Sequence, residues 1–377
     1  MRLPERSATP EVAGLLESSE VVATAHTIAA VQERSGAIPW FTGGHVDCWD
    51  HVECAMALSA AGMPEAAERA YAWLRRTQRP DGSWPMRTRG EAVEDTSAEA
   101  NHCAYVAVGV WHHLLVTGDE EFAAWMWPTV RCAVDFVLGL QTARGEIVWA
   151  RDGSGAAATH ALLAGCSSIH QSLRYAIALA DRQGEPQPDW ELAAGQLGHV
   201  VTAHPEAFAD RQRYSMDWYY PVLAGPVRGR SARRRLAARW EEFVVPGLGA
   251  RCVADRPWVT GAETCELALT LDALGERARA IALLRDMQHL REDDGSYWTG
   301  YVFEDDAIWP EEKSTWTAAA VILAADALSD TSGGAGIFRL AGLGAAGTPE
   351  PTDPLACGCE PALADADDPD GRALLWP

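Results

Sequence analysis

The chain has 377 residues, 48% of them hydrophobic, and its formal net charge at pH 7 is −22. The hydrophobic content is ample for a core. The acidity excludes nucleic acid as a partner, because such proteins need clustered Lys and Arg, and it opposes docking on an anionic membrane surface. The most apolar stretch, 104–116, is too short to span a bilayer, and no secretory signal is evident at the start. We therefore expect a cytoplasmic protein without a membrane span, whose oligomeric state is left open.

Helices are predicted along most of the chain, beginning with a long one over 11–33. Residues 43–84 then predict a helical hairpin. Its first helix is small and apolar, as in a buried inner helix, and its second, 64–78, is amphipathic, as in an outer helix. Gly62 ends the first and Pro64 begins the second. Further helices are expected at 97–116, 120–141, 157–181, 189–204, 217–224, 231–244, 260–274, 276–290 and 312–328.

The order of these helices predicts the fold class. No stretch alternates apolar and polar residues for more than a few positions, which indicates an all-α protein. Outer and inner helices alternate six times, and such pairs close most economically as an (α/α)6 toroid. We assign residues 1–330 to a single toroid domain. Residues 331–377 turn to Gly, Ala, Pro and Asp, a composition that predicts a poorly ordered acidic tail.

A short repeat follows three of the expected outer helices. It runs Gln78 to Gly82 to Trp84 in its first copy, and the later copies begin at Gln141 and Gln288. Glutamine can bind a frayed helix end, glycine supplies a turn with positive φ, and tryptophan packs back on the wall. We interpret the repeat as a structural staple first, and only second as a ligand contact.

The Gln–Gly–Trp repeat resembles that of terpene cyclases and protein prenyltransferase β-subunits. Class II terpene cyclases use a D-x-D-D motif, which occurs here only as Asp365-Ala-Asp367-Asp368 in the tail. The resemblance implies an isoprenoid substrate as one alternative.

The wider layout, over residues 40–328, resembles the six-hairpin glycosidases, in particular family 15 glucoamylases. The resemblance rests on the order of short motifs: Trp49-Asp50, Thr117-Gly118-Asp119, Trp127-Pro128, Gly145-Glu-Ile-Val-Trp149, Asp217-Trp218 and Trp309-Pro310-Glu311-Glu312. It implies a carbohydrate substrate and a pair of catalytic carboxylates. Glucoamylases place the general-acid glutamate where this chain has Ala150, so either another carboxylate takes that role or the hydrolytic chemistry is absent.

Polar residues gather at the expected starts of the inner helices, which a toroid would bring to one opening. Carboxylates are also favoured there as helix caps, so each one alone has a structural explanation. Inverting glycosidases need one acid and one base about 6.5–9.5 Å apart. We take Glu312 or Glu304 as the candidate base, and Glu263 or Asp50 as the candidate acid.

The substrate-binding candidates combine polar groups with some of the 16 tryptophans. They are Trp49, His51, Asn101, Asp217, Trp218, Trp258, Trp298 and Trp316. Indole faces stack on sugar rings, but they also shield carbocations. The first hypothesis is a glycosidase-like enzyme with two carboxylates in a tryptophan-lined pocket. The alternatives are a terpene cyclase or prenyltransferase, and a toroid that binds a glycan without catalysis.

No cofactor is expected, although one helix face offers a possible zinc site. Asp47, Asp50, His51 and Cys54 share a face by their helical spacing, and their side chains are common zinc ligands. No companion motif elsewhere supports the site.

Overall fold

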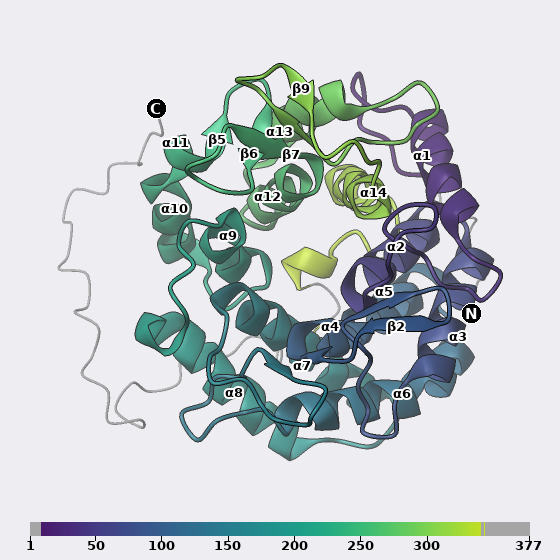
Figure 1. Ribbon diagram of the computed structural model, residues 1–377, viewed down its shortest axis with the longest axis vertical. Helices are drawn as coiled ribbons and strands as arrows, with labels where there is room; N and C mark the ends of the chain where they lie inside the picture. The colour runs from purple at the N-terminus through teal and green to yellow at the C-terminus, as the bar shows by residue number, and fades with distance from the viewer. Residues whose placement is uncertain (1–8, 341–342, 344–377) are drawn as a thin grey trace.

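Helical hairpins close into a ring in the computed structural model, which describes residues 9–340 and 343 (Figure 1). The inner helices are α2 (Cys48–Ala60), α4 (Ala100–Ala104) with α5 (Val106–Thr117), α7 (Leu163–Arg182), α9 (Ser215–Leu223), α12 (Gly261–Ala273) and α14 (Thr315–Ser329). The outer helices are α1 (Ser18–Val31), α3 (Pro64–Thr77), α6 (Glu120–Leu138), α8 (Pro188–Ala203), α10 (Gly229–Ala238) with α11 (Trp240–Phe243), and α13 (Arg277–Asp286). Helix α14 packs against α2 and closes the ring, so the predicted (α/α)6 toroid is confirmed.

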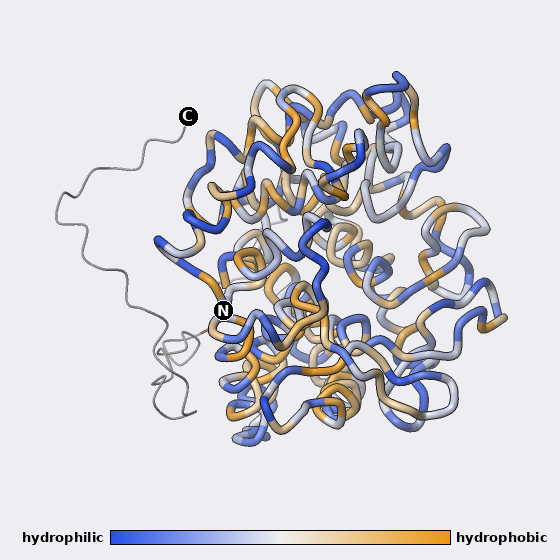
Figure 2. Tube along the Cα trace, turned by 60° about the vertical axis from the view of Figure 1, so that its left-hand side comes forward, coloured by the Kyte–Doolittle hydropathy of each residue, from blue (hydrophilic) through white to orange (hydrophobic). Residues whose placement is uncertain are grey.

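Burial separates the two rings of helices as the sequence pattern predicts. In α12 every residue from Gly261 to Asp272 is buried, because the helix has neighbours on both sides and the ring interior behind it. In α3 one face, with Ala67, Tyr71 and Leu74, is buried, while Glu65 is exposed. Figure 2 shows the same contrast along the chain, with hydrophilic segments in the outer loops and hydrophobic ones in the packed helices.

Several predicted helix boundaries differ from the structure. The helix predicted at 157–181 begins at Leu163, and the one predicted at 231–244 is divided into α10 and α11. The first helix begins at Ser18 and not at residue 11, because Glu17 and Glu20 form a reciprocal capping box there. The inner helix predicted at 97–116 is divided at Tyr105 into α4 and α5. Among residues 9–340 and 343, no helix is both long and apolar enough to cross a membrane.

The Gln–Gly–Trp repeat works as a staple between neighbouring hairpins. The Gln78 amide donates to the carbonyl of Gly82 at 2.9 Å and to that of Thr129 in α6 at 2.9 Å. Trp84 is buried and donates from Nε1 to the carbonyl of Leu74 at 2.9 Å. The copy beginning at Gln141 repeats both amide bonds, onto Gly145 and Ala193. Each staple therefore fixes one outer helix to the next.

A fourth copy of the staple was missed in the sequence. The Gln32 amide donates to the carbonyl of Gly36 at 3.1 Å and to that of Ala66 in α3 at 2.9 Å. In the copy beginning at Gln288, this amide instead binds Leu284 of its own helix. The spacing of four residues between glutamine and glycine, which Gln288 lacks, is the signal that marks the true staples.

The staple glycine gives a stability prediction, with Gly62 as its matched control. Both residues have positive φ, +90° at Gly82 and +81° at Gly62, so an alanine costs about 1–2 kcal/mol at either position. A methyl group at residue 82 would lie 2.0 Å from the carbonyl oxygen of Cys132, whereas nothing lies within 4 Å at residue 62. We expect Gly82→Ala to lose about 1–3 kcal/mol more than Gly62→Ala in urea unfolding. Equal losses would contradict this tight approach of the two segments.

Short strands lie between the helices of the ring. The sequence analysis did not predict these strands. They are β1 (Arg87–Arg89) with β2 (Ala92–Asp95), β3 (Ala98–Glu99) with β4 (Ala150–Arg151), and an antiparallel sheet in the order β5 (Val244–Val245), β6 (Gly249–Arg251), β7 (Trp258–Thr260), β8 (Gly300–Val302) and β9 (Ala307–Ile308). Strand β7 leads directly into the inner helix α12. We call this five-stranded sheet the rim sheet.

Residues 331–340 belong to the toroid, although the sequence analysis assigned them to the tail. Ile337 and Phe338 in η3 (Ile337–Arg339) are 2% and 4% exposed, and η3 lies within the ring of inner helices in Figure 1. Gln171 of α7 donates to the carbonyl of Ile337 at 3.3 Å, and Arg228 donates to that of Phe338 at 3.2 Å. The predicted boundary at residue 330 is therefore too early. Apart from residue 343, the rest of the predicted tail, including the D-x-D-D match, lies outside the described residues.

Candidate active site

Four of the predicted carboxylates come to one end of the ring, which we call the mouth. Asp50, Asp217 and Glu263 lie in the first turns of α2, α9 and α12. Glu312 lies in the loop just before α14. Inner helices of a toroid run in the same direction, so their first turns meet although they are far apart in sequence.

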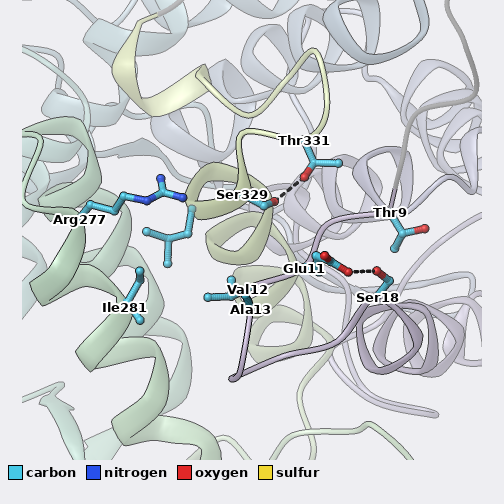
Figure 3. A pocket seen from close by; sticks show the side chains of 10 residues that line it. Thr9, Glu11, Val12, Ala13, Ser18, Arg277, Ile281, Ser329 and Thr331 are labelled. Carbon is cyan, nitrogen blue, oxygen red and sulfur yellow. Dashed lines mark hydrogen bonds between the residues drawn. The ribbon is translucent and has the colours of Figure 1, made fainter.

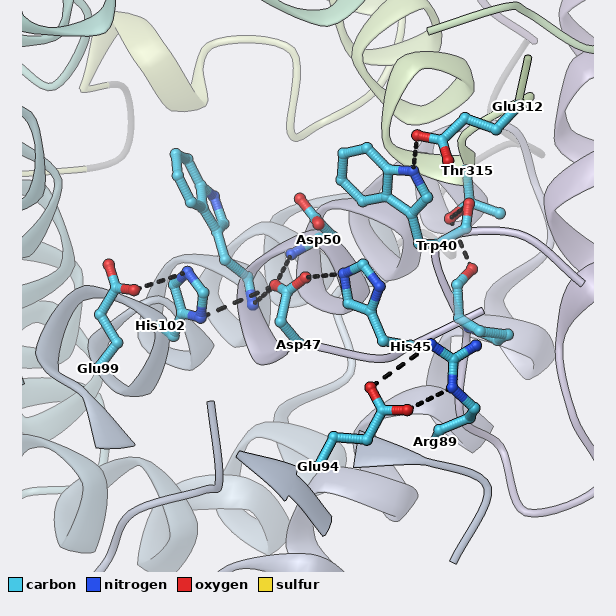
Figure 4. A network of polar contacts seen from close by, with 12 residues as sticks. Trp40, His45, Asp47, Asp50, Arg89, Glu94, Glu99, His102, Glu312 and Thr315 are labelled. Atoms are coloured by element: carbon cyan, nitrogen blue, oxygen red, sulfur yellow. Dashed lines mark hydrogen bonds and ion pairs between the residues drawn. The ribbon is translucent and has the colours of Figure 1, made fainter. Parts of the chain in front are cut away.

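Asp47 and Asp50 are two interacting acids at the mouth (Figure 4). Asp47 caps α2 by accepting the backbone N–H groups of Trp49 at 3.0 Å and Asp50 at 2.9 Å. Burial raises the pKa of Asp47, but His102, a hydrogen bond from Asp50 and His45 together bring it below its usual value. Burial and the adjacent Asp47 carboxylate raise the pKa of Asp50 well above the usual range. The pair therefore keeps its proton on Asp50 while Asp47 is ionised.

Two buried glutamates lie one helical turn below the mouth. Glu53 accepts from the Tyr105 hydroxyl at 3.0 Å and from Trp316 Nε1 at 2.8 Å. Glu266 accepts from the Tyr220 hydroxyl at 2.7 Å. Burial raises the pKa of Glu53 to about 7, and burial together with Glu53 raises that of Glu266 well above its usual value. These two residues form an acidic floor beneath Asp50.

Trp49 stands at the centre of an aromatic cluster above this floor. Its ring centroid lies 5.6 Å from that of Tyr105 and 5.6 Å from that of Tyr220, both edge-on. The Trp316 ring lies 6.4 Å away, and Trp40 lies 5.7 Å from Trp316. Such contacts hold the Trp49 indole in one orientation at the mouth.

A cavity of about 140 Å³ opens beside Trp49 and brings three predicted binding residues together. Trp49, Asn101 and Asp217 all line it, with Glu99 and Arg211. Asn101 is 4% exposed, and its Oδ1 is buried without a hydrogen-bond partner. A buried amide oxygen of this kind needs a donor, which a ligand hydroxyl would supply. Burial raises the pKa of Asp217 to about 6, against the opposing effect of Arg211.

Glu99 lies beside the position at which the sequence analysis found no acid. Ala150, where glucoamylases have their general acid, pairs with Glu99 across the β3–β4 ladder. The Glu99 carboxylate lies 3.4 Å from His102 Nε2, and burial raises the pKa of Glu99. A carboxylate is therefore present at this side of the mouth, supplied by the neighbouring strand.

The other predicted catalytic residues occupy different surroundings. Glu263 is 5% exposed, and burial together with the Glu263 carboxylate raises the pKa of the Cys252 thiol. Glu312 accepts from Trp40 Nε1 at 2.7 Å (Figure 4), and with Trp298 it lines a cavity of about 580 Å³ that α1 and α14 border. Glu304 is exposed in the turn between β8 and β9.

Two predicted binding residues do not reach the mouth. His51 is fully buried; its Nδ1 accepts from the backbone N–H of Ile38 at 3.0 Å, and its Nε2 lies 3.0 Å from the carbonyl of Ala70. Trp218 is 2% exposed and points outward, where it stacks on Phe243 with ring centroids 5.0 Å apart. Both side chains lie on the helix face turned toward the outer ring. Trp258 is on the rim sheet.

His51 is turned away from the other residues of the possible zinc site. Because both ring nitrogens of His51 are used by the backbone, this residue cannot join Asp47 and Asp50 as a ligand. In the part of the chain that the structure describes, no group of three or more His, Cys, Asp and Glu side chains is placed to hold a metal ion.

A larger cavity, of about 690 Å³, lies away from the mouth and is bordered by Glu11, Ser18, Arg277 and Ser329 (Figure 3). It lies where α14 ends, and so at the opposite end of the ring from the mouth carboxylates. None of the mouth carboxylates lines this cavity, so its size alone does not make it a candidate active site.

Sequence reasoning missed the acidic floor and part of the cavity wall. Glu53 follows Asp50 by three residues, and Glu266 follows Glu263 by three, so each pair shares one face of an inner helix. That repeated spacing was visible in the sequence. Arg211 and Tyr214, which also line the cavity, lie before α9 in a segment without a helical or strand pattern, and gave no signal.

Comparison with known proteins gives one extensive sequence match. The chain is 60% identical over 332 residues to the MMP endo-(1,4)-3-O-methyl-alpha-D-mannosidase of Mycolicibacterium hassiacum, covering 88% of this chain and 92% of that protein. No protein-family model matches the chain.

Solved structures of low sequence identity share the fold. A glycosidase in complex with glucose has a TM-score of 0.64 at 16% identity, covering 82% of this chain and 97% of the other. A D-mannose isomerase has a TM-score of 0.60 at 11% identity, with coverage of 82% and 97%. A rhamnosidase from Klebsiella oxytoca with rhamnose bound has 0.60 at 14% identity, with 85% and 65%. An isomerase among them shows that the fold alone does not determine the reaction.

Proposed function

The chain belongs to the family of the Mycolicibacterium hassiacum MMP endo-(1,4)-3-O-methyl-alpha-D-mannosidase, and from this premise we propose that it hydrolyses (1→4) bonds within a glycan of 3-O-methyl-α-D-mannose units. The observation that carries the proposal is the 60% identity, which extends over 88% of the chain. A carbohydrate substrate also suits the mouth, where carboxylates and indole rings lie together. The isoprenoid alternative draws no support from these relatives.

We assign the proton donor to Asp50. A general acid must carry a proton at the working pH, and the Asp47 carboxylate together with burial keeps one on Asp50. Asp50 is only partly buried, so it faces the mouth where a glycosidic oxygen would lie. In the reaction, the Asp50 proton passes to that oxygen as the bond between it and the anomeric carbon breaks.

We assign the general base to Glu263. The charge of Glu266 acts on Asp50, and the charge of Glu263 acts on Glu266. Asp50 and Glu263 therefore both lie close to the acidic floor. Glu263 would take a proton from the water that attacks the anomeric carbon. Glu312 is the weaker candidate because the Trp40 indole already occupies one of its oxygens, and Glu304 is weaker still because it is exposed on a hairpin.

The cavity beside Trp49 suits one sugar unit next to the bond that is cleaved. The indole offers an apolar face for the ring C–H groups and for an O-methyl group. Asn101 and Asp217 offer polar atoms for hydroxyl groups, and the unpartnered Asn101 Oδ1 is the most specific of these.

The size of the products tests the proposal. The purified protein is incubated with an α-(1→4)-linked 3-O-methylmannose polysaccharide, and the products are separated by mass. We expect oligosaccharide fragments from the earliest times, because an endo-acting enzyme cuts inside the chain. An unmethylated α-(1→4)-mannan and an α-(1→4)-glucan serve as comparison substrates. Tight binding without any cleavage would overturn the hydrolase proposal and favour the glycan-binding alternative that Ala150 raised.

A further inference from the structure

Trp309 is unusual among the large hydrophobic side chains of the described residues because it is exposed at the rim of the mouth. It is 55% exposed and follows directly after β9. Its backbone N–H donates to the carbonyl of Gly300 in β8 at 3.0 Å. The residue is therefore attached to the rim sheet and not to a free loop. The acids and the cavity of the proposed site do not explain an exposed indole at this position.

The rim sheet is built to support this indole. The Trp258 ring lies edge-on to the Trp309 ring, with centroids 4.9 Å apart at 78°. Trp258 Nε1 also donates to the carbonyl of Trp309 at 2.8 Å. A side chain at Gly300 would collide with Trp258, since its Cβ would lie 2.5 Å from Nε1. Gly300 thus leaves room for the Trp258 ring, and this ring hydrogen-bonds the backbone of Trp309.

Trp258 and Trp309 lie close in sequence to the proposed base, Glu263, and to the alternative base, Glu312. Strand β7, which carries Trp258, continues into α12 and Glu263. Trp309 precedes Glu312 in the loop that enters α14. Figure 1 shows β7 beside α12, and the backbone N–H of Thr299, just before β8, donates to the carbonyl of Glu312 at 3.1 Å. The exposed indole is therefore continuous with the mouth on that side.

The charges around Trp309 define the kind of ligand it can take. Glu304, Asp305, Asp306 and Glu311 are all exposed in the same hairpin and loop. An anionic glycan would be repelled by these carboxylates. A neutral sugar with its C–H face and methyl ether would instead stack on the indole.

We propose that Trp309, supported by Trp258, is a rim subsite that binds a further sugar unit of the same neutral, methylated glycan, away from the bond that is cleaved. The inference rests on the proposed function, because an enzyme that cuts inside a polymer must hold units on both sides of the bond. The occupant is the substrate chain itself, since the platform continues into the mouth.

The test compares a long and a short substrate. We expect Trp309→Ala to lower kcat/KM on the methylmannose polysaccharide about tenfold more than on a short oligosaccharide that fills only the mouth. Trp309→Phe should recover part of the difference. The matched control is Trp125→Ala, since Trp125 is 42% exposed on the outer helix α6, and it should show no difference between the substrates.

Two outcomes would overturn the subsite. One is an equal loss on both substrates, and the other is no loss on the polysaccharide. A binding measurement tests the subsite separately from catalysis. If the wild-type protein cleaves no glycan, the proposed function fails. Calorimetric titration with the polysaccharide still tests whether Trp309 binds it. An equal Kd for the wild type and Trp309→Ala would then reject the subsite, and a weaker Kd only for Trp309→Ala would support it.

Discussion

Asp50→Asn lowers kcat on the methylmannose polysaccharide by about 10²–10⁴-fold, which is the range that general acid catalysis contributes. Asparagine keeps the size of the side chain but has no acidic proton to give. KM should change little, because the sugar contacts of Trp49 and Asn101 remain. Initial rates at several substrate concentrations separate the two constants. A loss that appears only in KM would contradict a role in proton transfer.

The leaving group provides a sharper control for the role of Asp50. A dinitrophenyl leaving group departs from an oligosaccharide without receiving a proton. On such a substrate, Asp50→Asn should therefore recover most of the wild-type activity. Glu263→Gln should stay impaired, because the attacking water still needs a base. Glu99→Gln is the informative third variant. If it, and not Asp50→Asn, shows selective recovery on the activated substrate, the proton donor is Glu99.

The repeated hairpins explain why so much of the fold was predictable from sequence. Each pair contains one helix that is apolar all round and one that is amphipathic, so the periodicity alone distinguishes the inner ring from the outer. The staples that join neighbouring hairpins also use local spacing, as in Gln78 and Gly82. By contrast, the rim sheet consists of strands of two or three residues, which are too short to show an alternating pattern. Its β7–β8 pair also joins segments that are far apart in sequence.

The site was less predictable because side-chain direction depends on neighbouring helices. His51 follows Asp50 directly, but one side chain faces the mouth and the other binds the backbone of Ile38 and Ala70. Ala150 is the second example. Its sequence position lacks the acid that glucoamylases have there, yet Glu99 lies opposite it in a two-residue ladder that no local pattern reveals.

The last prediction concerns the acidic floor and its effect on stability. Burial raises the pKa of Glu53 from 4.5 to about 7 in the folded protein. Between these values the folded state holds a proton that the unfolded state has released, so stability falls as the pH rises. The shift corresponds to roughly 3 kcal/mol. In Glu53→Gln the side chain carries no charge at any pH, so this loss of stability disappears.

Urea unfolding at pH 5 and pH 8 measures the effect. The wild-type free energy of unfolding should fall more between the two pH values than that of Glu53→Gln. The variant should still fold, because the Tyr105 hydroxyl can rotate to accept from the new amide while Trp316 donates to the amide oxygen. Glu121→Gln, at an exposed position on α6, should follow the wild type. If Glu53→Gln also follows it, the pKa of Glu53 is not raised in the folded protein, and the protonated acidic floor is rejected.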